Sequence, residues 1–180
     1  METYRLIPHS AHPPLAVSGV EARVVGHNAN WLRLRWRIGG SGELVVPKFA
    51  GKGRADGLWQ TTCFELFLRP AGGDAYCEFN LSPSERWNAY DFSSRRGGMA
   101  ERTMPREPEC TIRLGSSFAI FDAAIPAAGL PISECSMALT CVIEEAVGQK
   151  SYWALDHGEI EPDFHDPACF TAHLAAPSAA

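Results

Sequence analysis

The sequence predicts an all-β protein, a single antiparallel β-sandwich of jelly-roll-like form. Two observations predict it. Apolar and polar residues alternate with a period of two in many short runs, and turn residues separate these runs, with thirteen prolines and sixteen glycines along the chain. Many short strands with frequent turns are typical of sandwiches. The chain shows no convincing helical stripe, apart from one short turn near 126–130.

The clearest strand is 30–38, in which Leu32, Leu34, Trp36 and Ile38 alternate with polar residues. The run 20–27 precedes it across the turn residues Asn-Ala-Asn, so we expect 20–38 to form a hairpin. Eight further strands are expected at 59–69, 75–81, 86–92, 110–114, 117–125, 136–144, 150–155 and 168–174.

The length of 180 residues fits one domain. We place this domain at 1–174 and expect 175–180 to be a disordered tail. Acidic residues outnumber basic ones by 21 to 16, and the resulting net charge of −5 disfavours a nucleic-acid partner. We find neither a signal peptide nor an apolar stretch of the ~20 residues that a membrane span needs. The expectation is therefore a cytoplasmic protein without a membrane partner.

The six cysteines include no CxxC pair, which argues against a zinc ribbon. Cys63, Cys77 and Cys141 fall within apolar runs. In a reducing compartment such cysteines are expected to be small core residues rather than disulfide partners.

The hairpin formed by 59–69 and 75–81 carries the pattern that points to function. Its apolar sides must pack together, which places Glu65, Glu78 and Asn80 on the opposite face. If Leu68 pairs with Ala75, the two glutamates lie directly opposite each other. A register shifted by two residues instead places Glu65 beside Asn80 or a tyrosine, Tyr76. Because opposed like charges destabilise a sheet, this face needs an arginine, a metal, water or the hydroxyls of a ligand.

Aromatic rings and arginines are close by in the sequence. Trp59, Trp87 and Tyr90 offer flat apolar surfaces, and Arg95 follows them in the sequence. We also expect the alternating arginines at 33, 35 and 37, the arginine row, to lie across the same face. An aromatic ring covers the apolar face of a sugar, while carboxylates, amides and guanidinium groups bind its hydroxyls. The same mixture is also typical of the solvated side of an antiparallel sheet.

Five segments resemble one known group of proteins. They are Leu-Trp-Gln-Thr-Thr-Cys-Phe-Glu-Leu-Phe-Leu at 58–68, Tyr-Cys-Glu-Phe-Asn-Leu-Ser-Pro at 76–83, Arg-Trp-Asn-Ala-Tyr-Asp-Phe at 86–92, Ser-Tyr-Trp-Ala-Leu-Asp-His at 151–157 and Pro-Asp-Phe-His-Asp at 162–166. In their order they resemble the DOMON-like proteins related to family 9 carbohydrate-binding modules. The resemblance implies a β-sandwich of about ten strands that binds a ligand without catalysis. Sugars are the commonest ligand class, and some members bind haem.

The resemblance also implies roles for individual residues. Trp59 matches a tryptophan that stacks on a pyranose, and Glu65 matches the glutamate six residues later. Glu78 and Asn80 lie on the neighbouring matching strand. The second stacking residue stays open between two tryptophans, Trp87 and Trp153.

The loop at 156–166 is rich in aspartate, glutamate and histidine. Carboxylates suit calcium and imidazole suits zinc, but the spacing matches no calcium loop and no HExxH motif. The structural alternative is a loop whose Asp and His side chains bond the backbone. By the resemblance this loop lies near the ligand face, so His157 or His165 is a candidate ligand contact.

The sequence thus predicts a non-catalytic module for a carbohydrate or a similar small polyhydroxylated ligand, without a required cofactor. One alternative is a glycosidase-like enzyme that uses Glu65 and Glu78 as its carboxyl pair. Another is a haem-binding module with a histidine and one of Met99, Met104 and Met137 as axial ligands. If the protein has a cofactor, calcium or haem is the candidate. A last alternative is a protein–protein interaction module, in which a sheet face or edge docks a peptide.

Overall fold

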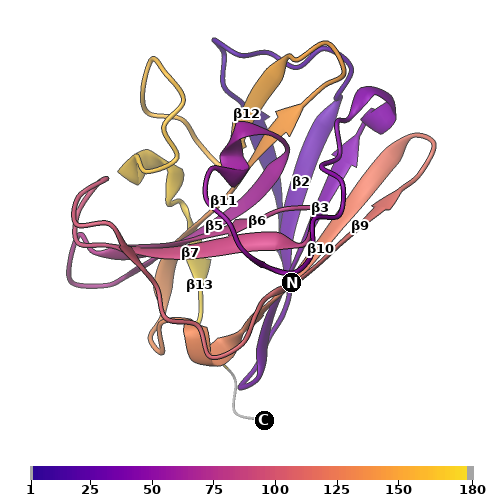
Figure 1. Ribbon diagram of the computed structural model, residues 1–180. Coiled ribbons are helices and arrows are strands. Elements are labelled where there is room, and N and C mark those ends of the chain that lie inside the picture. The colour runs from indigo at the N-terminus through magenta and orange to yellow at the C-terminus, as the bar shows by residue number, and fades with distance from the viewer. Residues whose placement is uncertain (1, 178–180) are drawn as a thin grey trace.

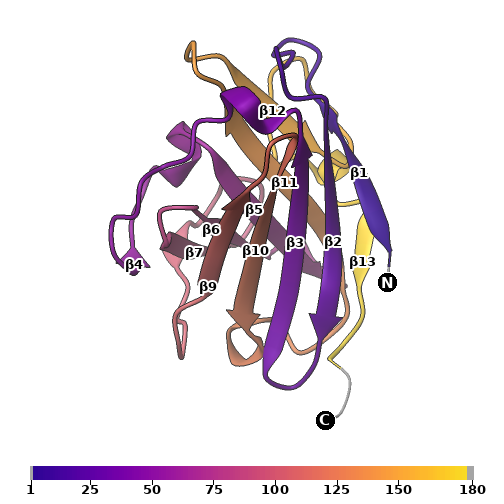
Figure 2. The ribbon, with the colours of Figure 1, turned by 90° about the vertical axis from the view of Figure 1, so that its right-hand side faces the viewer.

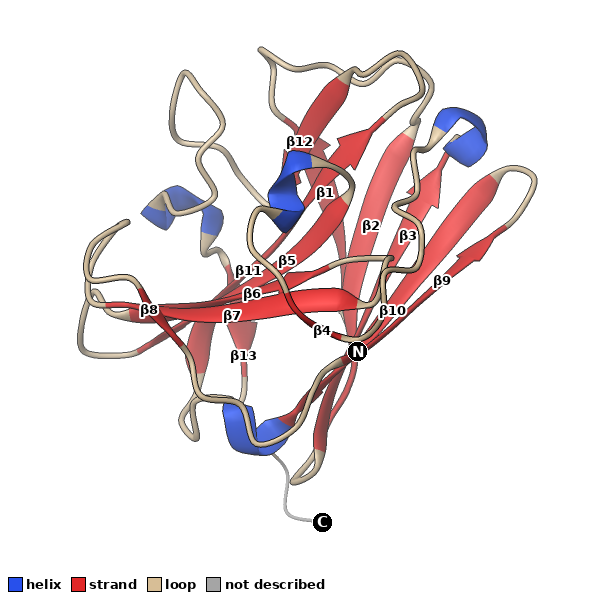
Figure 3. Cartoon of the chain, in the orientation of Figure 1, coloured by secondary structure: helices blue, strands red, loops and turns tan. Residues whose placement is uncertain are grey.

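The structure of the protein, a computed structural model, describes residues 2–177 (Figure 1). In this range thirteen β-strands form one sheet, and the helical structure consists of four short 3-10 turns (Figure 3). The all-β prediction is confirmed. The architecture differs from a simple antiparallel sandwich, because one continuous sheet curls until its two halves face each other, and because one strand pair is parallel.

The first half contains five strands, and Figure 2 shows it from outside. Their order in the sheet is β1 (Thr3–Pro8), β2 (Gly19–His27), β3 (Trp31–Gly39), β10 (Phe118–Pro126) and β9 (Glu109–Leu114). β1 also joins the halves: Thr3–Leu6 pairs with β2, whereas Ile7 and Pro8 pair with β12. This change of partner keeps the curled sheet continuous.

The second half carries the hairpin singled out by the sequence. Its strands run in the order β12 (Lys150–Ala154), β11 (Cys135–Glu144), β5 (Cys63–Pro70), β6 (Tyr76–Leu81), β7 (Arg86–Phe92) and β4 (Gly53–Arg54). Two short strands pair outside this path, β13 (Ala172–Leu174) with β11 and β8 (Ala100–Glu101) with β7. β4 and β7 form the parallel pair.

Most of the predicted strands are present within a few residues of their expected bounds. The strand expected at 59–69 begins only at Cys63, because Leu58–Gln60 forms a 3-10 turn (η2). The strand expected at 168–174 is reduced to β13 by a second such turn, η4 (Pro167–Cys169). A third turn, η3 (Ala127–Gly129), lies where the sequence predicts one, and η1 spans Ser41–Glu43. The expected tail falls in part on 178–180, outside the described residues.

The main core lies between the facing halves. Trp36 on β3 and Phe121 on β10 meet Phe64 on β5, whose ring stacks on Phe121 at 4.1 Å between centroids. All three side chains are fully buried. The alternation read in 30–38 is therefore confirmed, because its leucines, Trp36 and Ile38 all point into this core.

The outer face of the second half carries a smaller apolar cluster. The segment 155–171, between β12 and β13, lays Phe164 and Phe170 onto this face, where Phe170 contacts Phe67 and Tyr76. Part of the face that the sequence assigns to a ligand is thus covered by the protein's own chain. In the part left uncovered, the chain encloses a cavity.

The arginine row does not cross this face. Arg35 pairs with Asp122 at 2.6 Å, and Arg37 lies 3.8 Å from Glu21, both on the outer side of the first half. The expectation that the row reaches the hairpin is wrong, because β3 belongs to the other half and turns its polar side outward. All six cysteines are buried and free, and no helix within residues 2–177 is long and apolar enough to span a membrane.

Candidate functional site

The register of the β5–β6 hairpin decides how the two glutamates meet. Glu65 pairs with Asn80, and Glu78 pairs with Phe67 on the neighbouring strand. The shifted register is therefore the one adopted, and the two glutamates are diagonal neighbours rather than directly opposed. Both lie on the outer face, as the strand alternation predicts, and both line the same cavity.

The cavity has a volume of about 750 Å³. Strands β5, β6, β7, β11 and β12 contribute its floor, and the loops at 56–59, 96–99 and 161–165, with His12, form its walls. The lining residues are His12, Asp56, Gly57, Trp59, Glu65, Glu78, Asn80, Tyr90, Phe92, Arg96, Met99, Val142, Tyr152, Glu161, Pro162, Phe164 and His165. A volume of 300–1,000 Å³ with aromatic walls and a few convergent polar groups is typical of a small-molecule site.

The two carboxyl groups are nearly inaccessible to water. Glu65 is 3% exposed and Glu78 is 7% exposed. Burial, with the neighbouring Glu78 adding to it, raises the pKa of Glu65 well above its ordinary value. Burial likewise raises the pKa of Glu78 to about 7, against the opposing effects of the Asn80 hydrogen bond and the Arg96 charge. Protons are therefore retained on this floor at a pH where ordinary carboxyls are ionised.

Asn80, which lines the cavity, carries an acceptor atom without a hydrogen-bond partner. Its amide nitrogen donates to Glu78 Oε1 at 2.7 Å. Its Oδ1 is buried and accepts no hydrogen bond, although the residue is only 4% exposed. A buried polar atom without a partner costs about 1–3 kcal/mol, so the arrangement favours a ligand that donates to this atom.

His165 closes the other end of the floor. Its Nδ1 lies 2.6 Å from the Tyr76 hydroxyl, and its Nε2 lies 3.7 Å from Glu78 Oε2. Burial, reinforced by the Arg96 charge, lowers the pKa of His165 to about 4. The imidazole is accordingly neutral at physiological pH and gives Glu78 no counter-charge.

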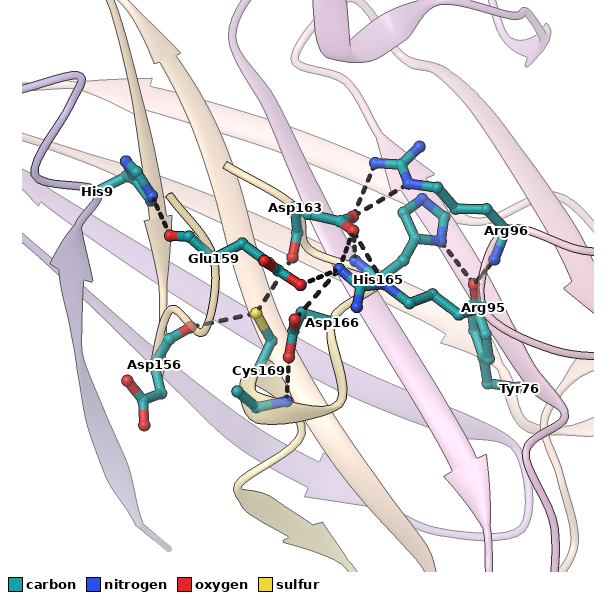
Figure 4. A network of polar contacts seen from close by, with 11 residues as sticks. His9, Tyr76, Arg95, Arg96, Asp156, Glu159, Asp163, His165, Asp166 and Cys169 are labelled. Atoms are coloured by element: carbon teal, nitrogen blue, oxygen red, sulfur yellow. Dashed lines mark hydrogen bonds and ion pairs between the residues drawn. The ribbon is translucent and has the colours of Figure 1, made fainter. Parts of the chain in front are cut away.

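Two neighbouring arginines fix the loop that forms one wall, as Figure 4 shows. Arg95 contacts Asp163 at 2.6 Å, Glu159 at 3.0 Å and Asp166 at 3.2 Å, and Arg96 contacts Asp163 at 2.7 Å. Burial alone would raise the pKa of Asp163, but the hydrogen bonds from Arg96 and Arg95 outweigh it and lower that pKa. The acidic loop thus uses its carboxylates to dock onto the 93–98 turn.

Arg96, and not Arg95, lines the cavity. The backbone of Arg96 is left-handed, with φ of 55°, and its N–H donates to the Tyr76 hydroxyl. This turn geometry directs Arg95 to the loop carboxylates. Arg95, a candidate ligand contact from sequence, is therefore a positioning residue of the wall.

Trp59 and Tyr90 both line the cavity, by different routes. Trp59 stands on the 3-10 turn before β5, with 53% of its surface exposed. Tyr90 on β7 donates from its hydroxyl to Asp56 and accepts from Asn88. An exposed tryptophan at the rim thus faces a tethered tyrosine on the floor.

Besides Arg95, three of the predicted ligand contacts lie outside the cavity. Trp87 and Trp153 are each 3% exposed and belong to the main core between the halves, so neither is available to a ligand in this cavity. The cause is strand alternation, because residues an odd number of positions away, Tyr90 on β7 and Tyr152 on β12, face the cavity instead. His157 lies outside the cavity, and its Nε2 bonds the Ile7 carbonyl.

Several lining residues were not among the sequence candidates. Tyr152 follows from alternation on β12, and Arg96 is the neighbour of a predicted residue. Asp56 and Phe164 lie in long connections between strands. No periodic pattern in the sequence predicts where the side chains of such connections lie. Among residues 2–177, no group of three or more His, Cys, Asp or Glu side chains is arranged to hold a metal ion.

No protein-family model and no curated protein matches the sequence. Solved structures share its fold, and two of them follow. A putative carbohydrate-binding protein from Bacteroides uniformis aligns with a TM-score of 0.65 at 17% identity, over 95% of this chain and 84% of that one. A family 9 carbohydrate-binding module from Caldicellulosiruptor kristjanssonii, solved in complex with glucose, gives a TM-score of 0.56 at 8% identity, over 98% and 85%. The fold of this chain is therefore similar to that of a family 9 carbohydrate-binding module.

Proposed function

We propose that the cavity binds a sugar or a similar small polyhydroxylated ligand and that the protein is a non-catalytic binding module. The observation that carries the proposal is the buried, unpartnered Oδ1 of Asn80 beside two buried carboxyl groups, under an exposed tryptophan. Hydroxyl groups both donate and accept, so they match a floor of this mixed kind. The shared fold with a glucose-bound module supports the same ligand class.

Isothermal titration calorimetry with glucose, galactose, mannose, xylose and their disaccharides tests the proposal. We expect saturable binding of at least one sugar. The absence of heat with every sugar, together with unchanged chemical shifts of the Trp59 indole in NMR titrations, would overturn the proposal.

Trp59→Ala is expected to weaken sugar binding by about tenfold or more, because a large apolar side chain that is covered on binding contributes roughly 1.5–3 kcal/mol. Stability should change little, since the indole is half exposed. The matched control is Phe49→Ala, which removes a 70% exposed ring outside the cavity. Equal affinities of parent and Trp59→Ala would show that the ligand does not stack on this ring.

Glycoside hydrolysis is the second candidate, favoured by the raised pKa of Glu78. Diagonal neighbours on paired strands have backbones about 7–8 Å apart, and inverting glycosidases hold their two carboxyl groups roughly 6.5–9.5 Å apart, so a pair on one face of a sheet is of the right order. We expect aryl glycosides to remain intact in the presence of the protein. Hydrolysis that is lost in Glu65→Gln would establish the enzyme instead.

The haem alternative stays a prediction. Met99 and His165 both line the cavity, whereas Met137 is buried in the main core.

A further inference from the structure

Carboxyl groups outnumber cations in the lining of the cavity. The titratable and charged side chains facing it are His12, Asp56, Glu65, Glu78, Arg96, Glu161 and His165. Arg96 is the one permanent cation of this set, and its guanidinium already contacts Asp163. His165 is neutral at physiological pH, as shown above. The unliganded cavity therefore holds more carboxyl groups than cations to pair with them.

Apart from the protons that the Glu65 and Glu78 carboxyl groups retain, several side-chain donors around the floor are already engaged. The Asn80 amide nitrogen is committed to Glu78, and the Tyr90 hydroxyl is committed to Asp56. The Arg96 guanidinium bonds Asp163 through two of its nitrogens. One acceptor in this lining, Oδ1 of Asn80, is buried and has no hydrogen-bond partner. An ammonium group suits this floor better than a hydroxyl, because it donates three hydrogen bonds and accepts none.

Aromatic walls complete the match to a cation. Trp59, Tyr90 and Tyr152 line the same cavity, and the faces of such rings attract cations, tryptophan most strongly. We infer that the preferred ligand is an amino sugar with a free primary ammonium group, bound by the carboxylates of Glu65 and Glu78 and by Asn80 Oδ1. This inference rests on the proposed function and narrows its ligand class.

The experiment compares three probes by calorimetry at pH 7: glucosamine, glucose and N-acetylglucosamine. Charge-assisted hydrogen bonds are roughly twice as strong as neutral ones, so we expect glucosamine to bind about tenfold more tightly than glucose. N-acetylglucosamine, which lacks the charge, should lose the advantage. Because ammonium binding favours ionised Glu78, the complex should release protons, which titrations in buffers of different ionisation enthalpy detect.

Glu78→Gln removes the charge and keeps an acceptor for Asn80. In this variant the ratio of glucosamine to glucose affinity should fall to about one, and proton release should decrease. Glu21→Gln is the control, because Glu21 lies on the outer side of the first half, away from the cavity. In the parent protein the preference for glucosamine over glucose should also diminish as the pH falls from 7 to 5, because Glu78 takes up a proton.

The outcomes separate the inference from the proposed function. If glucose binds as tightly as glucosamine, the amino-sugar inference is overturned and the sugar-binding proposal stands. If neither glucosamine nor any sugar of the calorimetric series above binds, both are overturned. Cyclohexylamine, an amine without hydroxyls, is the last probe: an affinity equal to that of glucosamine would indicate a cation site without sugar recognition and would overturn both.

Discussion

At pH 8, Glu78→Gln is expected to have a free energy of unfolding about 3 kcal/mol higher than that of the parent protein. At pH 4 the two should be nearly equal. The reason is the raised pKa of Glu78, about 7 in the folded state against an ordinary value of 4.5. Each pKa unit corresponds to about 1.4 kcal/mol, which gives an effect of this order.

The direction follows from the number of protons bound. Between the two pKa values the folded protein holds a proton on Glu78 that the unfolded chain has released. The contribution of this carboxyl group is therefore most favourable below pH 4.5 and is lost as the pH rises to about 7 and above. Glutamine keeps the shape and the acceptor but carries no charge, so its contribution does not change with pH.

His165 acts in the opposite direction, which is why the comparison of variants is needed. Its pKa of about 4 in the folded state lies below the ordinary value of 6.5, so the folded protein loses stability as the pH falls through this range. In the parent protein the two effects partly cancel. The difference between the parent and Glu78→Gln at each pH reports on Glu78 together with the part of the Glu65 pKa rise that Glu78 causes, because the burial of His165 is common to both proteins.

Urea unfolding at pH 4, 6 and 8 measures this difference, with Glu21→Gln as the control for a surface charge. A difference that stays below about 0.5 kcal/mol at pH 8, as for ordinary surface substitutions, would contradict a desolvated Glu78. The expected gain would show that the unliganded cavity costs stability, as functional sites often do.

Strand alternation explains how much of the site is readable from sequence. A period of two assigns every residue of β5 and β6 to one of two faces, and this places Glu65, Glu78 and Asn80 together. It leaves the register open, because shifting a strand by two residues preserves both faces. The register adopted here makes Asn80, and not Glu78, the direct neighbour of Glu65.

The rest of the site depends on contacts between distant segments. Trp59 reaches the rim from a 3-10 turn, so its position does not follow from the parity of the strand. Asp56 is placed by a long connection, and the choice between Arg95 and Arg96 depends on one left-handed residue. The curl of the sheet likewise rests on β1, whose pairing with β12 joins residues near opposite ends of the chain. Neither composition nor periodicity encodes such pairings locally.

One further carboxylate should matter greatly for stability. Glu145, just after β11, is 1% exposed, and its side chain accepts three backbone N–H groups from the connection between β1 and β2. The donors are Leu15 at 2.8 Å, Ala16 at 2.6 Å and Val17 at 3.1 Å. Three consecutive backbone N–H groups of the connection are thus bound by one side chain. Hydrogen bonds to charged groups contribute about 1.5–3 kcal/mol each, although partly exposed donors regain some of this from water.

Glu145→Ala is therefore expected to lower the free energy of unfolding by about 3 kcal/mol in urea titrations at pH 7. Glu145→Gln should lie between this variant and the parent, because an amide keeps one acceptor oxygen but turns a donor toward the N–H groups. Glu134→Ala, at a side chain with 67% exposure, is the control. Amide hydrogen exchange at residues 15–17 should accelerate in Glu145→Ala. Unchanged exchange there would contradict the inference, because it would mean that other contacts hold this connection in place.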